Sequence, residues 1–142
     1  MWADLVLSAE RQHALDLLAW AALSLLMGTA SLVVTRGRRG QSALIRGFAT
    51  QLAFWALVVA ALGVFEWYHL AMRDLSGAAR LERMTWARTG LDVGIVGMGV
   101  VLGGASYNLA RSQRGLGAAA AIAAQGLALL IIDLRLIGVI SR

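Results

Sequence analysis

Residues Leu91–Gly104 read LDVGIVGMGVVLGG, an apolar stretch that carries one carboxylate and several glycines. On a helix with about 3.6 residues per turn, Gly99 and Gly103 lie about one turn apart on one face. Asp92 and Ser106 extend the same face in both directions. In lipid, helices gain no hydrophobic driving force from one another, and small residues let two backbones approach closely. The stretch therefore predicts a membrane-spanning helix with a small-residue packing face.

The composition predicts a polytopic membrane protein. The chain has 142 residues, is 59% hydrophobic and contains neither proline nor cysteine, which is unusual for a soluble domain. Without cysteine, disulfides, thiolate nucleophiles and cysteine–zinc sites are excluded. All 13 basic residues are arginines, so lysine chemistry is excluded as well. The arginines gather at the ends of apolar segments, which indicates membrane topology and lipid contact; we expect no nucleic-acid partner.

The apolar segments predict an all-α fold, with four transmembrane helices arranged as two helical hairpins in a compact bundle. The expected spans form a single domain of residues 1–142 and cover about 14–35, 47–70, 88–110 and 115–140. Residues 71–87 mix arginines and acids with leucine, methionine and tryptophan, and they predict an amphipathic interfacial linker helix. The four spans leave no room for a soluble catalytic domain, so we expect no enzyme.

A short internal echo supports the two hairpins. Residues 27–40 read MGTASLVVTRGRRG and residues 102–115 read LGGASYNLARSQRG, with several identities at one offset. Either duplication of a hairpin or chance similarity explains the echo. Duplication would place equivalent helices symmetrically about an axis along the membrane normal. We therefore expect spans one and three to meet through their small residues, with Ser24, Gly28 and Ser31 facing Gly99, Gly103 and Ser106.

Each span carries one acid, and all four acids fall in the same half of the bilayer: Asp16, Glu66, Asp92 and Asp133. An unpaired charge at such depth costs about 3 kcal/mol on insertion scales, so the deeper acids should face inward and be paired. Arg88 is the expected partner of Asp92, and Arg135 that of Asp133. The acids either form a structural clamp between helices or bind a proton, an ion or a polar ligand.

Two histidines raise a metal-site alternative. His13-x-x-Asp16 opens span one and Glu66-x-x-His69 closes span two, a spacing used in di-metal helical bundles. The pattern is incomplete, because spans three and four add single acids and both histidines are expected near the interface. The sequence therefore predicts no metal and no cofactor, and these four residues form the alternative metal set. Gln125, deep in span four, is expected to hydrogen-bond to a neighbouring helix.

From Leu81 onward the chain resembles an uncharacterised family of bacterial four-span membrane proteins. The resemblance is carried by Leu81-Glu82, Leu91-Asp92-Val93-Gly94, Gly97, Arg114-Gly115-x-Gly117, Gln125-Gly126 and Asp133-Leu134. The chain departs from that family at Thr50-Gln51, where members carry asparagines, and at Ile95, where they carry tyrosine. The resemblance implies a four-span bundle in a bacterial inner membrane and directs attention to Asp92, Gln125 and Asp133, but it brings no known activity.

The orientation follows from two short loops, residues 36–46 and 111–114, whose charged residues are all arginines. The positive-inside rule favours a cytoplasmic position for these loops and non-cytoplasmic termini. The arginines of the linker and of the start of span three, Arg73, Arg80, Arg83 and Arg88, argue the other way.

Two functions remain open from the sequence. The leading prediction is a non-catalytic integral membrane subunit that self-associates or docks in a larger membrane complex, with an energy-converting complex as one example. Its partners would be membrane lipids and other subunits or further copies of the chain. The alternative is a small transporter, channel or ligand-binding protein that uses the carboxylate cluster. No sequence feature distinguishes the two.

Overall fold

The computed structural model describes residues 2–36 and 43–141, and these form four helices and no strand. Helix α1 covers Trp2–Arg36, α2 Ala43–Tyr68, α3 Leu75–Asn108 and α4 Gln113–Ile140. All four are long and apolar enough to cross a membrane. The predicted all-α, multi-pass membrane fold is confirmed.

Helices α1 and α3 are longer than the predicted spans. They contain 35 and 34 residues, or about 50 Å at about 1.5 Å per residue, whereas the hydrocarbon core is about 30 Å thick. The expected interfacial linker at 71–87 is therefore not a separate helix, because α3 begins at Leu75 and runs on without a break. Asp74 caps it, accepting a hydrogen bond of 2.7 Å from the Gly77 backbone N–H. That bond and the Ser76 hydroxyl lower the pKa of Asp74.

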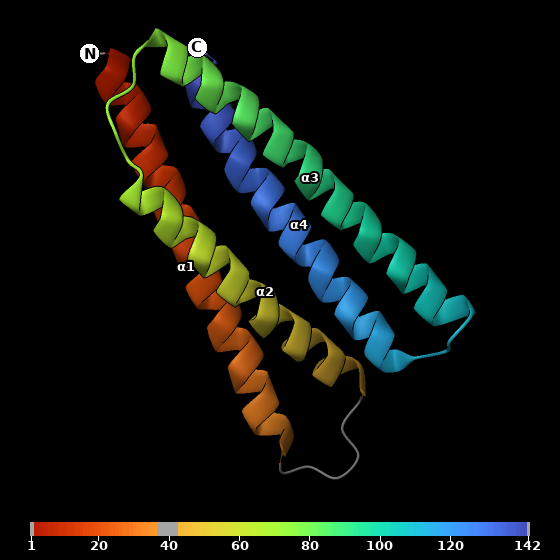
Figure 1. The fold of residues 1–142 in the computed structure, drawn as a ribbon. Coiled ribbons are helices and arrows are strands. Elements are labelled where there is room, and N and C mark those ends of the chain that lie inside the picture. Colours follow the sequence, from red (N-terminus) through yellow and green to blue (C-terminus); the bar gives the residue numbers. More distant parts are fainter. Residues whose placement is uncertain (1, 37–42, 142) are drawn as a thin grey trace.

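The helices associate as two hairpins joined along one seam. The extensive contacts are α1 with α2, α3 with α4, and α2 with α4, with a smaller contact of α1 with α4. Figure 1 shows both termini at one end of the molecule, and α3 lies along α4 at one edge. Within the described residues α1 and α3 are not an extensively packed pair.

The small-residue faces of α1 and α3 are packing faces, but each packs against the other helix of its own hairpin. A Cβ atom built on Gly28 would lie 2.9 Å from the carbonyl oxygen of Ala49 in α2. One built on Gly99 would lie 2.7 Å from the backbone nitrogen of Ala123 in α4. The prediction that Ser24, Gly28 and Ser31 meet Gly99, Gly103 and Ser106 is therefore wrong. The alanine-rich faces of α2 and α4 offer equally small surfaces on the neighbouring antiparallel helix.

Glycines also bring the two hairpins together. A Cβ atom on Gly117 of α4 would overlap the Leu44 carbonyl oxygen of α2, and one on Gly47 of α2 would overlap that of Arg114. Deeper in the bundle, Leu17, Ala21, Val59, Leu129 and Ile132 form an apolar core from α1, α2 and α4. This core fixes the depth and rotation of the helices that carry the polar residues described next.

Candidate functional site

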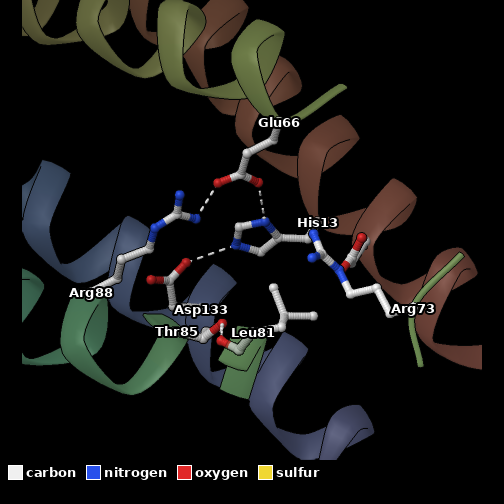
Figure 2. A network of polar contacts seen from close by, with 8 residues as sticks. His13, Glu66, Arg73, Leu81, Thr85, Arg88 and Asp133 are labelled. Carbon is white, nitrogen blue, oxygen red and sulfur yellow. Dashed lines mark hydrogen bonds and ion pairs between the residues drawn. The ribbon is translucent and has the colours of Figure 1, made fainter. Parts of the chain in front are cut away.

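His13 lies at the centre of a polar cluster that joins three helices. Its Nδ1 atom is 2.8 Å from Glu66 Oε2 of α2, and its Nε2 atom is 2.7 Å from Asp133 Oδ1 of α4. Figure 2 shows the imidazole ring between the two carboxylates. Only 4% of His13 and of Asp133 is exposed. Each contact needs one hydrogen, whereas a neutral imidazole carries a single N–H. The cluster therefore holds one additional proton, either on the ring or on a carboxyl group.

Arg88 brings the remaining helix into the cluster. Its Nη1 atom donates a hydrogen bond to Glu66 Oε1, so Glu66 is bound from both α1 and α3 (Figure 2). The arginine and the additional proton together balance the two carboxylates. We call His13, Glu66, Arg88 and Asp133 the polar cluster; its charges are paired, as buried charges in proteins usually are.

Asp92 lies beside the polar cluster and interacts with three of its members, Asp133, Arg88 and His13. It is 6% exposed, and its Oδ2 atom has no hydrogen-bond partner among the described residues. The predicted pairing partners were wrong. Arg88 binds Glu66, Asp133 binds His13, and Arg135 approaches Asp16. The α4 backbone comes close at this point, because a Cβ atom on Gly126 would lie 3.0 Å from the Asp92 carbonyl oxygen.

Two cavities flank the polar cluster, and Glu66 and Arg88 line both. The outer cavity, of about 130 Å³, is also lined by His13, His69 and the Glu10–Arg73 ion pair. The inner cavity, of about 200 Å³, is also lined by Trp55, Leu62, Asp92 and Asp133. The outer cavity is at the end of the bundle that holds the termini, and the inner cavity lies deeper between α2 and α3.

The other predicted site residues lie outside the polar cluster. Asp16 accepts a 2.9 Å hydrogen bond from Gln12 and lies 3.9 Å from Arg135, whose side chain is largely exposed. His69 is exposed, stacks on Phe65 and contacts the carbonyl oxygen of that residue. The alternative metal set of His13, Asp16, Glu66 and His69 is thus not brought together. Within the described ranges, no three histidine or acidic side chains are placed to hold a metal ion.

Gln125 forms the expected interhelical contact. It is fully buried and accepts a hydrogen bond of 2.6 Å from the Trp20 indole N–H, which joins α4 to α1. Its own amide nitrogen and the Ser24 hydroxyl have no partner among the described residues. The contact stabilises the association of the two hairpins.

Sequence reasoning underestimated His13 and missed the ion pair of Glu10 with Arg73. Placing the start of span one at Ala14 put His13 at the interface, whereas α1 is continuous from Trp2. The sequence contains a signal for this: residues spaced three or four apart, which share one helix face, continue upstream of the predicted span. In the structure these residues form the buried face of α1: Val6, Glu10, His13, Leu17, Ala21, Ser24 and Gly28.

A family model describes most of this chain. It is a family of unknown function, DUF6992, and it matches residues 16–134. The matched range contains Glu66, Arg88, Asp92 and Asp133 and begins after His13. No curated protein and no solved structure matches the chain. The match agrees with the expected resemblance to an uncharacterised family and covers well over half of the sequence: the chain belongs to the family of unknown function DUF6992.

Proposed function

We propose that this protein is a non-enzymatic, ligand-binding protein of a bacterial inner membrane. Its binding site is the inner cavity, where Asp92 and the polar cluster meet. The observation that carries the proposal is the Asp92 carboxylate, which is 94% buried, lines the inner cavity and has one oxygen without a partner in the described part of the chain.

A purely structural clamp does not account for Asp92. The polar cluster already joins all four helices without a bond from Asp92. A further buried carboxylate without a full set of hydrogen bonds destabilises the fold. A buried polar group of this kind is explained by a water, an ion, a ligand or a reaction that uses it.

The lining of the inner cavity supports the same proposal. Ligand pockets are mostly apolar and contain a small number of polar groups that fix orientation. Here Val58, Val59, Leu62, Ile95 and Leu129 supply apolar walls, and the carboxylates and Arg88 gather on one part of the lining. The cavity lies at the junction of the two hairpins, a usual place for a site in a helical bundle.

Replacing Asp92 with leucine tests this proposal. We expect the free energy of unfolding to rise by about 1 to 2 kcal/mol, because an unpartnered buried polar group is removed. We also expect mass spectrometry of extracts to detect a small molecule that co-purifies with the unaltered protein and is missing from Asp92→Leu. Asp16→Leu is the matched control and should change neither result by much, since Asp16 lies outside the inner cavity. A less stable Asp92→Leu protein with an unchanged extract would show that Asp92 is structural.

A second function, a subunit of a larger membrane assembly, is supported by the outer face of α3. Gly90, Gly94, Gly97 and Gly104 are exposed, and a Cβ atom on any of them would meet nothing within 4 Å. Such a face lets another helix approach closely in lipid. The occupant would be a second copy of the chain or another subunit.

This second function can be tested by cross-linking, because the chain has no cysteine of its own. A Gly94→Cys variant in membranes should form disulfide-linked or reagent-linked products. Leu134→Cys, on an exposed part of α4, should form far fewer. A protein that stays monomeric in both variants, with no cross-linked neighbour, would contradict a subunit role.

The orientation remains a prediction. We propose that the termini are non-cytoplasmic, because Arg111 and Arg114 lie in or beside the short α3–α4 connection at the opposite end of the bundle.

A further inference from the structure

The polar cluster contains a chain of two hydrogen bonds that share one additional proton. Glu66, His13 and Asp133 follow one another, with contacts of 2.8 and 2.7 Å at the two ring nitrogens (Figure 2). Imidazole can accept or give up a proton at either nitrogen. The additional proton can therefore pass from the ring to either carboxyl group along a hydrogen bond that already exists.

Charged groups from all four helices face this chain. Three carboxyl groups, Glu66, Asp92 and Asp133, surround the ring of His13, and Asp92 interacts with both Asp133 and His13. Arg88 is the only arginine among them, and it binds Glu66. Carboxylates that lie together in a buried site share protons rather than all carry a negative charge. The cluster thus needs at least one bound proton to balance its charges.

The outer cavity connects the polar cluster with the surface. The buried His13 and the exposed His69 both line it, at the end of the bundle that holds the termini. Its volume of about 130 Å³ has room for several water molecules, since each takes about 30 Å³ in the liquid. The ion pair of Glu10 with Arg73, also in the lining, offers polar partners to such waters. Protons can therefore reach His13 from water at this end.

In the other direction the polar cluster is closed by apolar packing. Leu17, one turn beyond His13, begins the apolar core that α1, α2 and α4 share. An ion finds no hydrogen-bond partners among these side chains, and its transfer into such surroundings is costly. The two ends of the bundle therefore differ in their access to the cluster.

We infer that the polar cluster is a proton-binding site that exchanges its proton with water through the outer cavity, from the end that holds the termini. His13 holds the proton together with Glu66 and Asp133. The site responds to the pH on one side of the membrane only. This function goes beyond the ligand proposed for the inner cavity and does not depend on it.

The chain has only two histidines, so nitrogen-15 NMR of the histidine-labelled full chain in lipid vesicles can follow both rings separately. We expect a protonation step of His13 between about pH 5 and about pH 10, distinct from that of the exposed His69. Asp133→Asn should weaken proton binding at His13 about tenfold, as the loss of a hydrogen bond between charged groups implies. Asp74→Asn, the same change at an exposed acid, should leave the step at His13 unchanged.

The path is tested by deuterium exchange of the His13 ring N–H after transfer to heavy water. Leu81→Trp puts a larger side chain into the lining of the outer cavity and should slow this exchange by at least about tenfold. Ile95→Trp is the matched control, because it enlarges another half-buried aliphatic residue of α3, in the inner cavity, and should leave the rate unchanged. His69 should exchange at the same rate in every variant.

A His13 ring that keeps one protonation state over the whole pH range would overturn the inference, because the cluster would then not release its proton. An unchanged step in Asp133→Asn would also overturn it. If Leu81→Trp exchanges as fast as the unaltered protein, or if Ile95→Trp slows exchange by as much, the outer cavity is not the path and the one-sided site is wrong.

Discussion

Replacing His13 with leucine is expected to lower the free energy of unfolding by about 3 to 5 kcal/mol, the usual loss when one partner of a buried ion pair is removed. His13 is the shared partner of Glu66 and Asp133, both within 2.8 Å of its ring nitrogens. Without the ring, two carboxylates remain in the bundle interior with a single nearby cation. Unfolding in detergent, followed by circular dichroism, gives the value.

His69→Leu is the matched control, because the same change is made at an exposed histidine whose ring stacks on Phe65 and contacts the carbonyl oxygen of that residue. It should change stability by no more than about 0.5 kcal/mol. A companion variant, His13→Leu with Asp133→Asn, should recover part of the loss, since the carboxylate left without its partner becomes neutral while Glu66 keeps its ion pair with Arg88. A loss below about 1 kcal/mol in His13→Leu alone would show that the polar cluster does not hold the helices together.

The helices could be predicted from the sequence, because local composition alone is enough to identify a long apolar helix. Their ends were less predictable. Residues 75–87 carry two arginines and one acid among apolar residues, a pattern that predicts a separate interfacial helix. No proline or glycine pair, however, interrupts the chain where α3 continues. A helix longer than the bilayer is thick gives no hydropathy signal for its projecting part.

The acids and the arginine of the candidate site could be predicted from the sequence, but the central position of His13 and the pairing could not. Glu66, Asp92, Asp133 and Arg88 were singled out, and all four line the inner cavity. Asp16 was placed with them because of its depth. On a helix, however, it lies about 60° around from His13, which turns it toward Arg135 at the surface. Depth follows from counting residues, whereas the pairing depends on helix rotation and on neighbours, which only the tertiary contacts decide.

The observed arrangement and the predicted one differ in which helices pack against each other. The Gly117→Ala substitution tests this difference. We expect this change to lower the free energy of unfolding by about 3 kcal/mol, near the upper end of overpacking losses. The new Cβ atom would overlap the Leu44 carbonyl oxygen, and a backbone atom cannot move aside as a flexible side chain would. Chemical denaturation of the detergent-solubilised protein gives the difference.

Gly104→Ala is the matched control and should change stability in the opposite direction. Its Cβ atom would meet nothing within 4 Å, so only the better helix propensity of alanine acts, raising stability by about 0.5 to 1 kcal/mol. If Gly117→Ala were also stabilising, α2 and α4 could not meet at this glycine. The two hairpins would then have to pack through other helices. The contact between spans one and three that the sequence predicts would again be a candidate. If the change from glycine to alanine lowers stability at position 117 and raises it at position 104, the two hairpins pack against each other through α2 and α4.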